Sequence, residues 1–238
     1  MSMATVIESV QGTPASGEND AAPQFNSTST SSSSVVLHGV SWKLYRALRR
    51  TRDNRNTRMT YDQGELEIMS PSAEHEGIAT LLGRLIDEWT LELAIPVRSC
   101  RTMTIKRAVL ERGFEPDNCY YVQHEPQMWN KKKIDFKKDP PPDLAIEVEV
   151  HHKLLDKIAI YAAFAVPELW CWRAETLTVL ELSTSGEYVP RATSACFPNF
   201  PIAKAQEIVR QVGAAHETEL VLSFRDWVRE NCLPSKTN

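Results

Sequence analysis

Hydrophobic residues recur at helical spacing most clearly between His75 and Leu93, and this pattern predicts the longest helix of the chain. Ser72 stands ahead of the segment as a candidate N-terminal cap, and Pro96 closes it. The same spacing predicts a second helix at residues 153–166 and a mostly helical part at residues 202–231. The predicted helices are therefore spread along the chain, with other elements between them.

The segments between the helices have the alternating or continuous apolar character of β-strands. Strands are predicted at residues 65–69 after a turn at Gly64, and at 97–107, 119–123, 144–150, 168–173 and 177–182. Strands and helices follow one another in mixed order, which predicts an α/β fold in which a mixed β-sheet is flanked by helices.

The first 36 residues have a different composition from the rest. They are rich in Ser, Thr, Ala and Gln and end near a serine-rich run at residues 27–34. Such a segment buries too little apolar surface to offset the entropy lost on ordering. We expect residues 1–36 to be a disordered tail that is dispensable for stability, and residues 37–238 to form one domain.

Charge restricts the ways in which the protein could bind nucleic acid. The formal net charge is −4 and the isoelectric point is about 5.9, so a nucleic-acid site would have to be a local basic patch on an acidic body. Six arginines occur within thirteen residues. One interpretation is that these arginines belong to a solvent-exposed helix end and loop. The alternative is that they contact a nucleic-acid phosphate backbone, whose geometry suits guanidinium groups. The six are Arg46, Arg49, Arg50, Arg52, Arg55 and Arg58.

Compartment and membrane signals point to a cytoplasmic protein. The five cysteines form no CxxC pair, and their odd number and wide spacing suit reduced thiols. No apolar run approaches the roughly 20 residues that span a bilayer, so no membrane association is expected. The first ten residues lack the basic and apolar regions of a signal peptide.

Two carboxylates lie on one face of the strand predicted at 144–150. Side chains alternate along a strand, so Glu147 and Glu149 share a face and stand roughly 7 Å apart, where they can converge on a hard cation. The alternative is a half-exposed edge strand with a polar outer face. In the next helix, Lys157 lies beside an inward-packed stripe, where it either reaches solvent or pairs with Glu147 or Glu149.

A third acidic residue precedes another predicted strand. Pro116 cannot donate a ladder hydrogen bond, so Asp117 is expected at the start of a strand or on an edge. A Pro-Asp pair is also a common turn signal. Alone, this position is therefore compatible with a structural or a chemical role.

Four blocks of sequence resemble the Uma-two family of restriction-endonuclease-like proteins. They are GELEIMSPSAEHE at 64–76, FEPDNCYYV at 114–122, PPDLAIEVEV at 141–150 and LLDKIAIYAAFAVPELWCW at 154–172. The resemblance extends over residues 40–190. It implies the restriction-endonuclease-like fold of the PD-(D/E)XK nuclease superfamily, with a mixed sheet flanked by helices and Mg²⁺ or Mn²⁺ at the carboxylates.

The resemblance also implies roles for particular residues. Asp117 and Glu147 match the superfamily's metal-binding acids, and the backbone carbonyl of Val148 is a further candidate ligand. The superfamily lysine is replaced by Glu149, which would bind a second ion or act as a base. Lys157 takes the place of that lysine on the next helix and would stabilise charge at phosphorus.

Three further positions match the family pattern: His75, Tyr161 and one acid of GELEIM, for which Glu67 is preferred to Glu65. If the site forms, the functional atoms of Asp117, Glu147, Glu149 and Lys157 should lie within roughly 4 to 8 Å of one another. Carboxylates crowded in one cleft should repel, so Glu147→Gln is expected to leave folding stability equal or slightly higher.

The sequence thus predicts a Mg²⁺-dependent endonuclease that hydrolyses DNA phosphodiester bonds. The alternative is a catalytically inactive protein of the same fold that binds nucleic acid or a protein partner, which Glu149 and the acidic net charge favour. Nucleases that act on duplex often pair, so a homodimer is compatible with either function.

Overall fold

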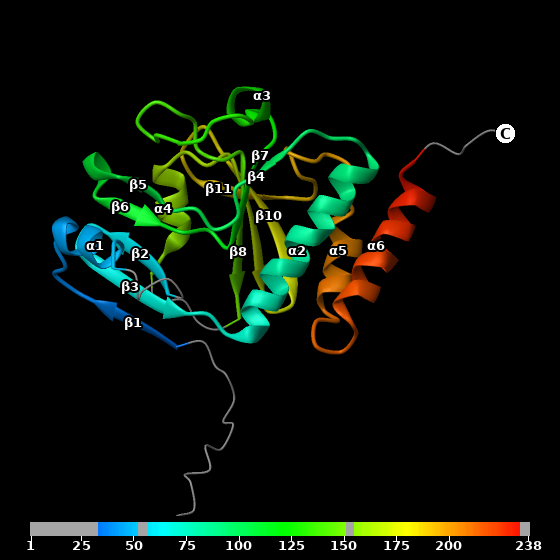
Figure 1. Cartoon of the computed structure of the whole chain (residues 1–238), viewed down its shortest axis with the longest axis horizontal. Helices are drawn as coiled ribbons and strands as arrows, with labels where there is room; N and C mark the ends of the chain where they lie inside the picture. Colours follow the sequence, from blue (N-terminus) through cyan, green and yellow to red (C-terminus); the bar gives the residue numbers. More distant parts are fainter. Residues whose placement is uncertain (1–32, 52–56, 151–154, 234–238) are drawn as a thin grey trace, which may run out of the picture. The chain divides into compact units, whose positions relative to one another are not determined.

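The computed structural model describes residues 33–51, 57–150 and 155–233, which all belong to one compact unit, Ser31–Asn238. Eleven strands form two sheets within these residues, and helices cover the sheet faces (Figure 1). The predicted mixed α/β fold with helices flanking a mixed sheet is confirmed, with the difference that a second sheet is present.

The smaller sheet has five strands, all antiparallel to their neighbours, in the order β1-β3-β2-β6-β5. Helix α1 (Trp42–Leu48) packs on it through Tyr45, which stacks on Tyr61. Gly64 has φ +108° in the tight turn between β2 and β3, a conformation that side chains disfavour, as the sequence predicted for a turn there. The strands are β1 (Ser33–Leu37), β2 (Arg58–Asp62), β3 (Glu65–Ser70), β5 (Ile105–Arg107) and β6 (Arg112–Phe114).

The larger sheet has six strands in the order β11-β10-β9-β8-β7-β4. Only β8 and β9 pair in parallel, and α4 (Lys157–Ala163) lies on the crossover between them. The other pairs in this sheet are antiparallel. The strands are β4 (Arg98–Ser99), β7 (Asn118–Tyr121), β8 (Leu144–Glu149), β9 (Glu168–Arg173), β10 (Thr176–Leu182) and β11 (Tyr188–Arg191).

The two faces of the larger sheet meet different partners. Helices α2 (Ala73–Glu92), α5 (Ile202–Val209) and α6 (Glu217–Asn231) lie along one face, and α4 lies on the other, toward the smaller sheet (Figure 1). Gly83 lets α2 approach β7 closely, because a Cβ there would lie 2.5 Å from the side-chain nitrogen of Asn118. This close packing brings the start of α2 to the strand segment that carries Asp117.

Several predicted boundaries change. Residues 33–36 belong to β1 and not to a tail, while residues 1–32 lie outside the described residues. The single strand predicted at 97–107 is two short strands in different sheets. Within the described residues, the second helix begins at Lys157, after an Asp156 cap. No helix among the described residues is long and apolar enough to cross a membrane.

Candidate active site

Strand β8 carries Glu147 into the interior between the two layers. Ile146 and Val148 point from β8 into the core formed with α2, so alternation turns Glu147 toward α4 on the opposite face. The Glu147 side chain is only 1% exposed. The strand is therefore not an exposed edge, and the carboxylate needs partners inside the protein.

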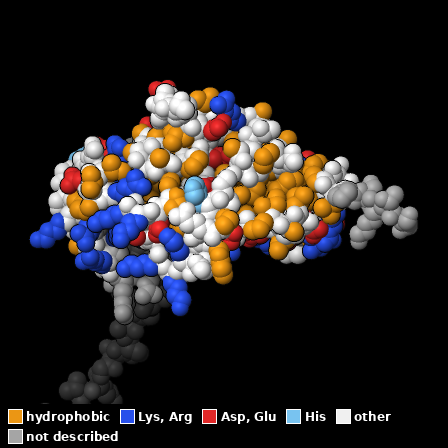
Figure 2. Space-filling model, turned by 90° about the horizontal axis from the view of Figure 1, so that it is seen from above, with side chains coloured by type: hydrophobic (Ala, Val, Ile, Leu, Met, Phe, Trp, Pro, Cys, Tyr) orange, Lys and Arg blue, Asp and Glu red, His pale blue; other side chains and the backbone are white. Residues whose placement is uncertain are grey.

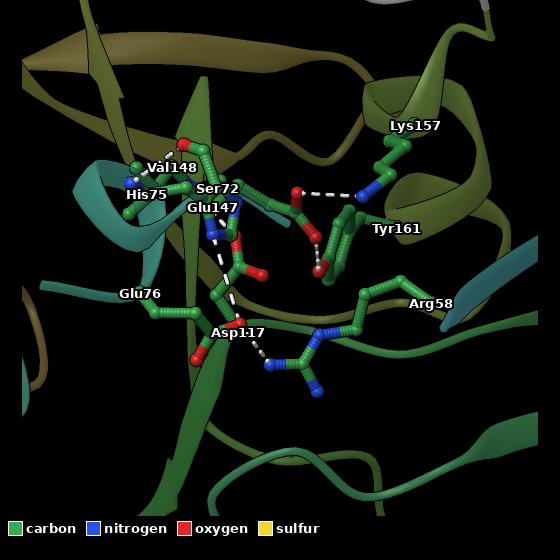
Figure 3. A network of polar contacts seen from close by, with 9 residues as sticks. All are labelled: Arg58, Ser72, His75, Glu76, Asp117, Glu147, Val148, Lys157 and Tyr161. Carbon is green, nitrogen blue, oxygen red and sulfur yellow. Dashed lines mark hydrogen bonds and ion pairs between the residues drawn. The ribbon is translucent and has the colours of Figure 1, made fainter. Parts of the chain in front are cut away.

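Both partners of Glu147 come from the helix that follows. Lys157 Nζ donates to Glu147 Oε2 at 3.0 Å, and the Tyr161 hydroxyl donates to Oε1 (Figure 3). Four residues separate Lys157 from Tyr161, so both lie on one side of α4. Asp156 fixes the first turn by accepting hydrogen bonds from the backbone N–H groups of Ile158 and Ala159.

The ion pair with Glu147 keeps the buried Lys157 side chain charged. Burial alone would lower the pKa of the Lys157 ammonium, but the charges of Glu147 and Asp117 outweigh burial and hold it above its ordinary value. Burial and the Glu147 charge likewise raise the pKa of Tyr161, which therefore stays protonated and can donate. Glu147 is thus paired with a buried cation, so the repulsion on which the Glu147→Gln expectation rests is offset. The effect of that substitution on stability stays a prediction.

Asp117 stands just before β7 and next to β8. Its Oδ2 accepts the backbone N–H of Val148 at 2.8 Å and lies 3.3 Å from Nε2 of His75. Its other oxygen, Oδ1, is buried and has no hydrogen-bond partner among the described residues. Burial works to raise the pKa of Asp117, but His75, Lys157 and the Val148 N–H together hold it below its ordinary value.

His75 reaches Asp117 from the first turn of α2. Ser72 caps this helix, as predicted, by accepting the His75 backbone N–H at 3.1 Å. Burial works to lower the pKa of His75, yet the hydrogen bond and charge of Asp117 raise it overall. The other ring nitrogen, Nδ1, has no hydrogen-bond partner among the described residues and lies 3.9 Å from Glu76 Oε1.

Arg58 and Glu76 border the same network and were not among the predicted site residues. Arg58 Nη2, from β2, donates to Glu76 Oε1 at 2.9 Å, and Figure 3 shows the guanidinium on the Asp117 side of the network. Sequence spacing gave no signal for this pair, because it depends on how β2 meets α2. Arg58 appeared in the sequence only as one of six clustered arginines.

The two remaining predicted acids differ in their surroundings. Glu67 is 4% exposed on β3, and its charge helps to raise the pKa of Lys157, whereas Glu65 is half exposed and pairs with His38. Glu149 lies next to Arg173 of β9, with Oε1 3.5 Å from Nε. The structure therefore brings Glu67 to the network, while Glu149 lies two residues farther along β8.

A cavity of about 420 Å³ opens beside Glu147 at the carboxyl ends of the parallel strands β8 and β9. Glu147, Glu149 and Lys157 contribute to its lining, together with Arg173. Glu147 is thus shared between this cavity on one side and the buried pair of Asp117 and His75 on the other. Asp117 is not among the residues that line this cavity.

The described site has few side chains that could act as metal ligands. Among the described residues, no group of three or more His, Cys, Asp or Glu side chains could hold a metal ion. Mg²⁺, however, keeps several waters and is bound through one or two carboxylates plus substrate phosphate. Asp117 Oδ1 has no hydrogen-bond donor within the described part of the chain, and Glu147 is the nearby carboxylate on β8.

One comparison with known proteins identifies a family. A family model described as "Uma2: Putative restriction endonuclease" matches residues 42–213, well over half of the chain. A solved structure of "a putative nuclease belonging to DUF820" from Anabaena variabilis is 14% identical and has a TM-score of 0.46, over 78% of this chain and 99% of that one. No curated protein matches the chain.

Proposed function

Since the chain belongs to the Uma2 family of restriction-endonuclease-like proteins, we propose that it is a metal-dependent endonuclease that hydrolyses phosphodiester bonds of DNA. The observation that carries the proposal is the meeting of Asp117 and Glu147, on neighbouring strand segments, with a charged lysine bonded to one of them. The three residues come from three separate sequence blocks that resemble the family, which is why we propose them as its site.

Asp117 Oδ1 and a Glu147 oxygen would hold Mg²⁺ or Mn²⁺, with the backbone carbonyl of Val148 as a further ligand. When bound, the ion would lower the pKa of a water molecule and offset negative charge on the phosphate. The Val148 N–H and His75 hold Oδ2 of Asp117, which leaves Oδ1 as the oxygen available for a ligand. The carboxylate is thus oriented before any ligand arrives.

Lys157 supplies fixed positive charge. Its raised pKa keeps it protonated at neutral pH, so it cannot act as a general base, and it can stabilise charge that develops on the phosphoryl oxygens. Tyr161 positions Glu147 through its hydrogen bond. Glu149 lines the same cavity and is the remaining candidate base or second-ion ligand, and Glu67 balances the charge of Lys157.

Nicking of supercoiled plasmid in Mg²⁺ or Mn²⁺ tests the proposal. We expect the wild-type protein to nick and Asp117→Asn to lose at least 100-fold in rate. Asp226→Asn, which removes an exposed carboxylate of α6, is the matched control and should retain the wild-type rate. Equal nicking by Asp117→Asn and the wild type would place any activity elsewhere or in a contaminant.

A non-cleaving DNA-binding protein of the same fold is the second candidate. It is favoured by Glu149 at the superfamily lysine position and by the hydrogen bonds that both Glu147 oxygens already accept. Binding of duplex DNA without nicking in either metal would support it against the enzyme. Cytoplasmic location and a homodimer stay predictions, the latter testable by sedimentation velocity.

A further inference from the structure

A group of basic side chains stands apart from the candidate active site, on α1 and the neighbouring strand β5. Figure 2 shows Lys and Arg side chains gathered at the left of the view, the side on which Figure 1 places α1, β5 and β6. We call this group the α1 basic surface. It consists of Lys43, Arg46, Arg49, Arg50 and Lys106.

Helix geometry places these residues together. Trp42 and Tyr45 face the small-sheet core, so Lys43 and Arg46, three positions apart on α1, share its outer face. Arg50 follows in the turn after Arg49, the C-terminal cap of the helix. All three side chains are exposed. The core-facing aromatic residues therefore fix the orientation of the basic stripe.

One arginine of the surface is held rigidly. Arg49 donates to Glu115 and, through Nη2 at 3.0 Å, to Thr104, while Thr104 donates to the same Glu115 oxygen at 2.8 Å. Glu115 is 6% exposed, so this carboxylate is committed to the interior. Arg49 thus anchors the end of α1 beside the segment that leads to Asp117.

The rest of the surface carries uncompensated charge. Among the described residues, no ion pair involves Lys43, Arg46, Arg50 or Lys106. Partial burial lowers the pKa of Lys106, and Arg46, Arg49 and Arg50 lower it further by repulsion. Like charges gathered in this way weaken folding and favour a multivalent anion.

The surface is also close to the candidate active site along the chain. Glu115, which binds Arg49, precedes Asp117 by two residues, a span of at most about 7 Å of extended backbone. Duplex DNA rises roughly 3.4 Å per base pair along each strand, so this span equals about two base pairs. A duplex centred on the site would therefore pass the anchor of the surface, Arg49 with Glu115, within a few base pairs.

We propose that the α1 basic surface binds the phosphate backbone of duplex DNA on one side of the cleavage position, an inference that rests on the proposed function for the identity of its ligand. It accounts for nucleic-acid binding by a protein of net charge −4, because a local basic patch replaces bulk attraction. The surface contacts phosphates and carries no base readout, so it positions DNA without selecting a sequence.

The test is equilibrium binding of a fluorescein-labelled 30-base-pair duplex by the full-length protein in EDTA, followed by anisotropy between 50 and 200 mM salt. The triple variant Arg46→Glu/Arg50→Glu/Lys106→Glu spares Arg49 and its buried partner. We expect its affinity at 100 mM salt to fall at least tenfold and its salt slope to shrink by about 2 to 3, since each phosphate contact contributes about 0.9.

The matched control reverses three exposed lysines in the loop after α3 (Glu125–Met128), namely Lys132, Lys133 and Lys137. It changes the net charge equally and should bind within twofold of the wild type. Neutralisation of the surface residues as Arg46→Gln/Arg50→Gln/Lys106→Gln should lower affinity in the same direction, by a smaller factor. Equal losses in surface and control variants would overturn the proposal in favour of bulk charge.

Binding in EDTA separates this inference from the proposed activity. Asp117→Asn should keep wild-type binding while it loses nicking. If the wild type does not nick plasmid DNA but the surface variants lose duplex binding, the proposed nuclease activity is wrong. The inference that the α1 basic surface binds DNA is then still supported. If the wild type fails to bind the duplex at 50 mM salt, or surface variants that melt like the wild type also bind like it, the inference is wrong.

Discussion

The larger sheet holds two kinds of buried carboxylate, and the difference lies in their donors. Glu168, at the start of β9, accepts from Trp170 Nε1, from the Ser194 hydroxyl and from the backbone N–H groups of Ala195 and Cys196, at 2.5 to 3.0 Å. Asp143, just before β8, accepts the N–H groups of Val122 and His124. Asp143 also pairs through Oδ1 with Nδ1 of the His124 ring. Both oxygens of each carboxylate therefore have partners, and these contacts bind loops to the sheet.

Asp117 and Glu147 have fewer backbone donors, and most of their partners are titratable side chains. Lys157, Tyr161 and His75 supply donors, and Asp117 Oδ1 has none among the described residues. Burial alone therefore does not separate structural from functional carboxylates. Partners at both oxygens, two of them backbone N–H groups, mark the first kind, while a buried lysine and an oxygen without a described partner mark the second.

Removal of a loop-binding carboxylate should have the largest effect on folding. Glu168→Ala leaves four donors without their acceptor, three of them on buried residues, and the free energy of unfolding should fall by about 4 kcal/mol. Urea unfolding measures the change. Glu181→Ala, at a largely exposed position of β10, is the control and should cost about 0.5 kcal/mol or less. A loss below about 1 kcal/mol for Glu168→Ala would show that Glu168 does not hold its loop to the sheet.

The ion pair of the candidate site should come next. Lys157→Met leaves Glu147 buried without its charged partner, so we expect a loss of about 3 kcal/mol in the free energy of unfolding. Adding Glu147→Gln to this variant should restore part of the loss, because no unpaired charge remains at that position. A double-mutant cycle from urea melts measures the coupling, and strict additivity would show that the pair contributes nothing.

The response to metal should separate Asp117 from Asp143 directly. At a Mn²⁺ concentration 100 times its dissociation constant, the wild type should gain about 2.7 kcal/mol in stability. Asp117→Asn should gain almost nothing, whereas Asp143→Asn should be less stable but respond to the ion as the wild type does. Thermal melts with Mn²⁺ and with EDTA provide the measurement. An equal gain in Asp117→Asn would place the ion elsewhere.

The smallest effect is expected from the protonation of His75. Its pKa is raised in the folded protein by Asp117, so the folded state holds the proton more tightly than the unfolded chain does. The stability difference between the wild type and His75→Gln in EDTA should be complete below the ordinary histidine pKa of about 6.5 and decline as pH rises through the raised value. Urea melts from pH 5 to 9 measure it, and a difference that grows with pH would reverse the sign of this interaction.

Local pattern was enough to predict the elements that build the site. The α2 spacing, the Ser72 cap and the alternation of β8 all depend on neighbouring residues, and the structure confirms them. The prediction of one strand at 97–107 was wrong, because the two ends of this segment pair in different sheets. Local periodicity carries no information about which sheet a strand joins. The end of the predicted second helix also changed, at the Ala165 position with φ +56°.

The contacts of the site were less predictable than its residue types. The pairing of Glu147 with Lys157 and Tyr161 follows from a strand and the next helix, and could be anticipated as one alternative. The Arg58–Glu76 pair and the Arg173 neighbour of Glu149 depend on how separate elements meet. The metal ligands, Glu67 and the catalytic roles stay predictions.

The position of β1 also matters for handling the protein. Residues 33–37 pair along the whole of β3 and so cover an edge that would otherwise present unpaired N–H and C=O groups. A chain truncated to begin at residue 38 would expose the edge of β3 to strands of other molecules. We expect such a chain to aggregate more readily than it unfolds. Limited proteolysis that removes only residues before 33 should leave a monomer or dimer that does not aggregate. Cleavage within residues 33–37 should give a product that aggregates.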